Sequence, residues 1–146
     1  MAISENKRAY FDYEILETFE AGMELRGFEV KSIKNGKINL AGSHAVVRGN
    51  EVWLLNADIS PYQPKNMPEN YNSKRTRRLL MHKKEISALI GKTKEKGLTL
   101  VPLKVYIKNQ KIKLEIGLAK SKKKTDKREN IRKREVQREI RTEKTK

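Results

Sequence analysis

Cysteine is absent from the 146-residue chain, and His44 and His82 are its only histidines. The absence of thiols excludes a disulfide framework, a thiolate zinc site and a thiol nucleophile. Two histidines do not build a metal site by themselves, and no acidic cluster accompanies them in the sequence. We therefore expect neither a metal ion nor a cofactor.

Long apolar runs and catalytic motifs are also missing. Residues 1–8 lack the apolar core of a signal peptide, and no run approaches the length that spans a bilayer. The chain has no Gly-rich phosphate loop, no nucleophile elbow and no isolated pair of carboxylates. We expect a soluble cytoplasmic protein that is not an enzyme and does not contact a membrane.

Positive charge, by contrast, is in excess, because 34 Lys and Arg face 18 Asp and Glu and give a net charge of +16. Such a charge points to nucleic acid, an anionic membrane or an acidic protein. A membrane-bound helix needs a broad apolar face, whereas Ile131, Val136 and Ile140 form only a thin stripe. Nucleic acid is therefore the favoured partner.

Half of the net charge lies in residues 120–146, where thirteen Lys and Arg against five Asp and Glu give +8. Three large aliphatic residues are too few to bury a core, so we expect an unfolded or conditionally helical tail. Residues 1–119 suffice for one domain with its own core. The sequence thus predicts an RNA-binding body, 1–119, and a basic tail, 120–146.

Alternating apolar residues predict two antiparallel hairpins in the body. Residues 98–119 turn at 109–110, and residues 45–55 turn at 48–50. A further strand begins at Tyr13, with a bulge or bend expected at Gly22. Hairpins with inserted helices and no βαβ alternation predict a mainly β fold, namely an OB-fold-type antiparallel barrel with accessory helices.

Two helices are expected between these strands. A short one ends at Gly36, although its apolar spacing also permits a strand. A longer one covers residues 73–94, with Ser73 as its N-cap. Residues 60–72 contain three prolines and predict a loop.

The densest basic run of the body lies at the start of this longer helix. It comprises Lys74, Arg75, Arg77, Arg78, His82, Lys83 and Lys84. A basic helix face is often simply solvated, but cations at a helix N-terminus oppose the helix dipole. That cost favours a role in binding RNA phosphates. Two interpretations of His82 stay open: it contacts a base, or it simply caps the surface of the helix.

Glu20 and Trp53 each carry two readings. A carboxylate such as Glu20 can accept a hydrogen bond from a base edge or a ribose hydroxyl. An ion pair within the protein is an equal alternative for Glu20. Trp53 is flanked by apolar residues, which favours a core position over a base-stacking one.

Several motifs together resemble one known family. They are Asn6-Lys7-Arg8-Ala9, Thr18-Phe19-Glu20-Ala21-Gly22, Gly27-Phe28-Glu29-Val30-Lys31-Ser32, Arg75-Thr76-Arg77-Arg78-Leu79-Leu80-Met81-His82-Lys83, Gly97-Leu98-Thr99-Leu100-Val101-Pro102-Leu103 and Asp126-Lys127-Arg128. These motifs cover essentially the full chain and resemble the SmpB family, the SsrA-binding proteins of trans-translation.

The resemblance implies an OB-fold body that binds the tRNA-like domain of transfer-messenger RNA (tmRNA, or SsrA RNA). It implies delivery to stalled ribosomes with elongation factor Tu and the alanyl-tmRNA complex, and we expect a monomer. In the family, the positions of Glu20, Leu80 and His82 contact RNA. The full predicted set of tmRNA-binding residues is Asn6, Lys7, Glu20, Lys31, Arg75, Arg77, Arg78, Leu80, His82 and Lys83.

The resemblance also implies that the tail enters the vacant mRNA channel and becomes helical at the decoding centre of the ribosome. The predicted tail contacts are Lys122, Lys123, Lys124, Asp126, Lys127, Arg128, Arg132 and Arg134. Thr125 and Val136 stand where many relatives have rings, so charge and backbone contacts to ribosomal RNA would carry more of the binding. The alternatives are a general RNA-binding module, a ribosome-assembly protein and an RNA-modifying enzyme.

Overall fold

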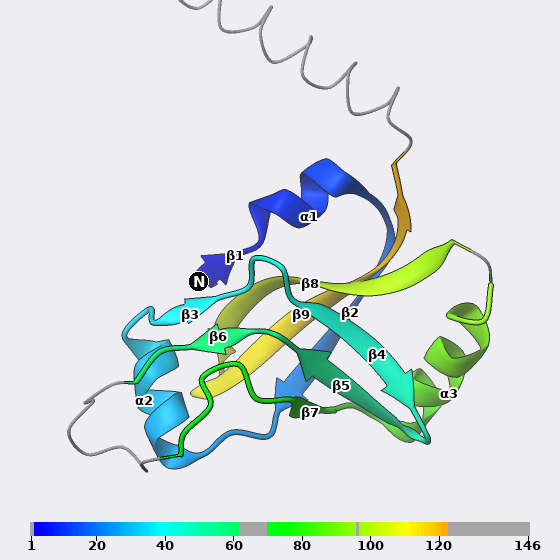
Figure 1. The fold of residues 1–146 in the computed structure, drawn as a ribbon. Coiled ribbons are helices and arrows are strands. Elements are labelled where there is room, and N and C mark those ends of the chain that lie inside the picture. Colours follow the sequence, from blue (N-terminus) through cyan, green and yellow to red (C-terminus); the bar gives the residue numbers. More distant parts are fainter. Residues whose placement is uncertain (1, 62–69, 96, 123–146) are drawn as a thin grey trace, which may run out of the picture.

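The computed structural model describes residues 2–61, 70–95 and 97–122, and β-strands dominate this part of the chain (Figure 1). The strands are β1 (Ala2–Glu5), β2 (Tyr13–Met23), β3 (Ile38–Asn39), β4 (His44–Arg48), β5 (Glu51–Leu55), β6 (Asp58–Ile59), β7 (Arg77–Leu80), β8 (Leu98–Lys108) and β9 (Lys111–Ser121). The helices are α1 (Lys7–Asp12), α2 (Gly27–Lys34) and α3 (Lys83–Lys92). The mainly β prediction is confirmed.

Most strands belong to one antiparallel sheet of seven strands in the order β1-β8-β4-β5-β7-β2-β9. Strand β8 also pairs with β9, so the ladder from β8 through β4, β5, β7, β2 and β9 returns to β8. Strands β3 and β6 form a separate pair. The ring of strands leaves the long strands β2, β8 and β9 with a hydrogen-bonded neighbour on each side, which limits exposed sheet edges.

The core lies inside this ring of strands. Leu54, Leu79 and Leu114 are fully buried there, because alternate side chains of a strand point to the same face. Helices α2 and α3 lie on opposite sides of the strands and add Ile33 and Leu89, which are also fully buried (Figure 1). A core of this kind needs no disulfide to hold it.

A smaller apolar cluster lies where α1 covers the outer face of β8 and β9. Ala9 of α1 packs there against Val101, Leu103 and Ala119. A Cβ atom added at Gly117 would stand 3.0 Å from Leu103 Cδ1 and 3.1 Å from a methyl carbon of Ile15. Glycine at this position lets the side chains under α1 approach the sheet closely.

Both predicted hairpins are confirmed. Asn109 and Gln110 connect β8 to β9 with φ of 50° and 65°, the left-handed conformation that a two-residue type I′ turn requires. Gly49 has a φ of 64° and begins the turn between β4 and β5. The short helix is confirmed as α2, and Gly36 follows its end with a φ of 76°.

The predicted helix over residues 73–94 is wrong in its first half. Arg77–Leu80 form strand β7, which pairs with β5 on one side and β2 on the other. Helix α3 begins only at Lys83, and the Glu85 carboxylate accepts the backbone N–H of His82 at 3.4 Å. Ser73 is therefore not an N-cap, and pairing with distant strands has overridden the local helical pattern.

Two local predictions also need correction. Gly22 pairs regularly with Leu80 and Lys113, and the irregularity of β2 lies between Ile15 and Glu17 instead. Trp53 is not in the core, because Val52 and Leu54 occupy the buried face of β5. The half-buried indole of Trp53 lines an outer hollow with Val46, Leu55 and Thr76.

The ordered strands continue past the predicted boundary at residue 119. Strand β9 continues to Ser121, and the backbone N–H of Lys122 donates to the carbonyl of Asp12 at 3.0 Å. Lys122 Nζ also donates to the carbonyl of Tyr10 at 3.1 Å. The predictions for residues 123–146 and for the loop at 62–69 lie outside the described residues. Within the described ranges, none of the helices combines the length and apolar character that a membrane crossing requires.

Candidate nucleic-acid interface

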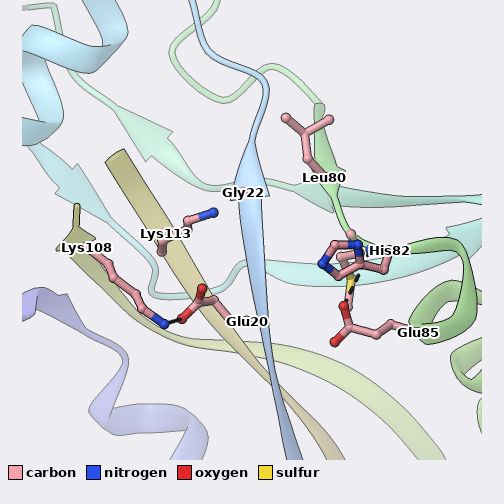
Figure 2. A pocket seen from close by; sticks show the side chains of 8 residues that line it. Glu20, Gly22, Leu80, His82, Glu85, Lys108 and Lys113 are labelled. Carbon is pink, nitrogen blue, oxygen red and sulfur yellow. Dashed lines mark hydrogen bonds and ion pairs between the residues drawn. The ribbon is translucent and has the colours of Figure 1, made fainter. Parts of the chain in front are cut away.

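Glu20, Leu80 and His82 converge on one surface hollow of about 550 Å³, here called the Glu20 hollow (Figure 2). Strand β2 supplies Glu20, the end of β7 supplies Leu80, and His82 directly precedes α3. The remaining lining residues are Gly22, Met81, Glu85, Lys108 and Lys113. Glu20 and the pair Leu80 and His82, which belong to two motifs far apart in the sequence, thus share one site.

Gly22 of β2 is one of the residues that line the Glu20 hollow. Gly22 pairs with Leu80 on one side and with Lys113 on the other. Figure 2 shows Glu20 and Lys108 on one side of this strand and His82 on the other. A Cβ atom at Gly22 would lie 3.4 Å from Leu80 Cβ, in contact with that side chain.

Glu20 is held in place by two donors. The Tyr106 hydroxyl donates to Glu20 Oε2 at 2.5 Å, and Lys108 Nζ donates to the same oxygen at 3.4 Å. The ion pair within the protein, one of the two alternatives that the sequence left for Glu20, is therefore present and is made with Lys108. Both contacts among the described residues use Oε2, and 38% of the Glu20 side chain is exposed, which leaves Oε1 to an external donor.

The same contacts fix the protonation states of the pair. The hydrogen bond from Tyr106 holds the pKa of Glu20 below its usual value, with a smaller contribution from Lys108 and opposition from partial burial. Burial and the Glu20 carboxylate raise the pKa of Tyr106 in return. At neutral pH the site therefore presents an ionised acceptor beside a protonated phenol.

The Glu20 hollow combines the kinds of groups that RNA-binding proteins use. The Glu20 carboxylate can accept from a base or a ribose hydroxyl, and the ammonium groups of Lys108 and Lys113 can bind phosphates. Leu80 is 46% exposed and offers an apolar contact, while the exposed His82 ring can stack or hydrogen-bond. No bond-breaking step follows from this arrangement.

The predicted basic run 74–84 does not form a single face. Arg77 is fully buried, and its Nη2 donates to Glu29 Oε2 at 2.6 Å while its Nη1 donates to the Ala57 carbonyl at 2.7 Å. Arg75 also donates to Glu29. The prediction that Arg77 contacts RNA is wrong, because its guanidinium is enclosed by protein; the Arg75 side chain is 24% exposed.

Glu29 is the centre of this internal network. Burial alone would raise its pKa, but hydrogen bonds from Arg75, from the Arg26 backbone and from Arg77 outweigh burial and hold the pKa of Glu29 at about 2. The carboxylate also accepts from the Tyr71 hydroxyl at 3.1 Å. Two cations of the predicted site thus anchor α2 to the segment that leads into β7.

Other predicted residues lie apart from the Glu20 hollow. Asn6 is buried, and its Nδ2 donates to the Pro102 carbonyl at 2.9 Å, so a direct RNA contact by Asn6 is also corrected. Those on the surface outside the hollow are Lys7, Lys31, Arg78 and Lys83, and Arg78 also pairs with Glu24 and Glu51. Lys122 is bound to α1, and the other predicted tail contacts lie outside the described residues.

Comparison with known proteins identifies the family. The model of the SmpB protein family matches residues 3–146. The chain belongs to the SmpB family. The SsrA-binding protein of Carboxydothermus hydrogenoformans is 56% identical over 94% of this chain and 92% of its own. That of Geobacillus kaustophilus is 56% identical over 94% and 88%.

A solved structure similar to this SmpB family member carries the description "tmRNA-SmpB: a journey to the center of the bacterial ribosome". It is 46% identical, has a TM-score of 0.69, and covers 88% of this chain and 94% of the other. The resemblance drawn from the sequence motifs is thereby confirmed.

Tyr106, Lys108 and Lys113 are the residues of this SmpB fold that sequence reasoning missed. Alternation in the hairpin marks them as outward-facing, but outward-facing lysines are usually only solvated. The signal lies in two strand pairings: that of β2 with β9 places Gly22 opposite Lys113, and that of β9 with β8 places Lys113 opposite Tyr106. The Phe19-Glu20-Ala21-Gly22 motif does not reveal that register.

Proposed function

We propose that this protein binds the tRNA-like domain of tmRNA and brings it to stalled ribosomes in trans-translation. The observation that carries the proposal is the convergence of Glu20, Leu80 and His82 with Lys108 and Lys113 in one hollow. Relatives bear the name SsrA-binding protein, and the description of the similar solved structure names tmRNA, SmpB and the ribosome. The action would take place in the cytoplasm and needs no catalytic residue.

The proposal divides the work between body and tail. The ring of strands, which we interpret as an OB-fold-type barrel, would hold the RNA, and elongation factor Tu would accompany the alanyl-tmRNA complex. Residues from 123 onward, including Asp126, Lys127 and Arg128, would enter the vacant mRNA channel at the decoding centre. Eleven Lys and Arg against five Asp and Glu in residues 123–146 suit an RNA-lined channel.

Glu20→Ala in the full chain tests this function. Dissociation constants for the isolated tRNA-like domain of tmRNA are measured over a range of salt concentrations. We expect roughly 10-fold or greater weakening with an unchanged salt slope, because the carboxylate reads a base or a sugar and not a phosphate. Glu14→Ala removes an exposed carboxylate from the same strand outside the hollow and should bind normally.

A control RNA tests the alternative that the protein binds structured RNA in general. A structured RNA of the same size and charge should bind much more weakly than the tRNA-like domain at the same salt concentration. Equal affinity for both RNAs, together with no effect of Glu20→Ala, would support a general RNA-binding module instead.

A further inference from the structure

A second hollow of about 380 Å³ adjoins the Glu20 hollow, and we call it the Val30 hollow. The two hollows share Gly22, Leu80 and Lys113. The other residues that line the Val30 hollow are Met23, Leu25, Val30, Gln110, Lys111 and Ile112. They come from β2, the segment after it, α2 and the tip of the β8–β9 hairpin. Leu80 is the part of β7 that both hollows share.

The two hollows differ in chemistry. Met23 and Ile112 are almost fully buried, at 8% and 9% exposure, and with the half-buried Leu25 and Val30 they make the Val30 hollow largely apolar. Lys111 and Lys113 add positive charge, and none of the described residues that line it is acidic. An apolar hollow beside cations suits an unpaired base and the phosphate attached to it.

Gln110 provides an independent observation at the same place. Its φ of 65° lies in the left-handed region, where glycine is relaxed and a glutamine is strained. The strained residue lines the Val30 hollow. Its amide supplies both a donor and an acceptor, which is the pattern needed to read the edge of a base.

Leu80 is exposed and is placed where it could insert between two bases. It is 46% exposed although it ends a strand whose other apolar residue, Leu79, is fully buried. Apolar side chains inserted between neighbouring bases unstack them and hold them apart. A nucleotide on each side of Leu80 would place one base in each hollow.

We propose that the Val30 hollow binds one unpaired base of the RNA whose adjacent nucleotide occupies the Glu20 hollow, with Leu80 inserted between the two bases. Gln110 reads the edge of the base in the Val30 hollow, and Lys111 and Lys113 neutralise its phosphates. This inference rests on the proposed function, because one RNA fills both hollows. It restricts the recognised element to two consecutive unpaired nucleotides.

Fluorescence of 2-aminopurine tests the inference. Copies of the tRNA-like domain of tmRNA, each with one unpaired nucleotide replaced by 2-aminopurine, are titrated with the full chain. We expect a change at two adjacent positions. Val30→Ala and Gln110→Gly should each remove or reduce the change at one of them and weaken binding about five-fold or more, while the response of the neighbour persists.

Matched variants separate this effect from loss of folding. Val47 is, like Val30, a half-buried valine packed on the main core, but it lines neither hollow, so Val47→Ala should leave every fluorescence response unchanged. Lys111→Ala should lower the salt slope by about one, whereas Lys34→Ala, which removes an exposed charge from α2, should not.

Three outcomes are decisive and distinguishable. If Val30→Ala and Gln110→Gly leave all responses intact while Glu20→Ala weakens binding, the Val30 hollow is not a base site and tmRNA binding stands. Two responding positions that are not adjacent in the RNA would likewise overturn the role of Leu80. If Glu20→Ala also has no effect, the proposed function itself fails.

Discussion

Glu29 and Arg77 form a fully buried ion pair, and neither side chain is exposed to solvent. Charges in such a position cost solvation energy, which only close hydrogen bonds compensate. The Arg77 guanidinium donates such bonds to the Glu29 carboxylate and to the carbonyls of Ala57, Arg75 and Ser73. The stability of this pair therefore depends on both partners.

Glu29→Gln should destabilise the protein by about 3–5 kcal/mol, because it leaves the buried charge of Arg77 without a counter-ion. Urea unfolding followed by circular dichroism measures the loss. Glu24→Gln is the matched control, since Glu24 is 62% exposed and its oxygen lies 3.7 Å from Arg78. A change below 1 kcal/mol in Glu29→Gln would show that the pair adds little to stability.

The contribution of the Glu29–Arg77 ion pair to stability should also appear in the pH dependence of unfolding. The folded-state pKa of Glu29 is about 2 against an ordinary value of 4.5. A carboxyl with a lowered pKa stabilises the fold fully above its unfolded pKa and loses this contribution as the pH falls. About 3 kcal/mol should therefore disappear between pH 4.5 and pH 2. In Glu29→Gln that part of the pH dependence should be missing from unfolding curves.

At the scale of elements, the β8–β9 hairpin carries a strained turn. Gln110→Gly should raise the free energy of unfolding by about 1 kcal/mol, because glycine adopts the left-handed conformation without strain. Gly49→Ala in the other hairpin should lower it by a similar amount, since Gly49 has a φ of 64°. Denaturant midpoints measure both changes. If both variants raised the free energy of unfolding, or both lowered it, this account of the turns would be contradicted.

The hairpins were predictable from sequence, whereas β7 was not. Alternating apolar residues on both sides of residues 109–110 leave little doubt about that turn. Strand β7 has the alternation of a strand as well, but Arg77 occupies a buried position in it and is neutralised by Glu29, which lies 48 residues earlier. A charged residue at a core position hides the pattern that would identify the strand.

Trp53 and the site lysines illustrate a second limit. An unbroken apolar run such as Val52–Trp53–Leu54–Leu55 does not show which face is buried, so the outward position of Trp53 was not predictable. The motif that contains Glu20 was enough to propose this residue for the site. Its neighbours Lys108 and Lys113 depend on the register between strands that are distant in sequence.

At the scale of the whole molecule, the structure changes where body and tail should be separated. Deletion of residues 120–146 would remove the last two residues of β9 and the anchor at Lys122. Deletion of residues 123–146 leaves both intact. The longer deletion should lower the unfolding midpoint, and the shorter one should not.

Removal of residues 123–146 should keep binding of the tRNA-like domain within a few-fold at moderate salt and should abolish rescue of stalled ribosomes. The body retains both hollows, while the proposed probe of the mRNA channel is gone. Binding is measured with the RNA domain, and rescue as peptide transfer to alanyl-tmRNA on ribosomes that carry a truncated message. Loss of both activities would contradict the division between body and tail.

Strand β7 has only four residues, and its two faces have different tasks. Arg77 and Leu79 point inward to the ion pair and the core, while Leu80 points outward to both hollows. A shift of one residue in pairing would exchange the two sets of side chains. The exchange would bury Leu80 and expose Arg77. A molecule folded in the wrong register would therefore be unable to hold the RNA, so RNA binding itself selects correctly assembled copies.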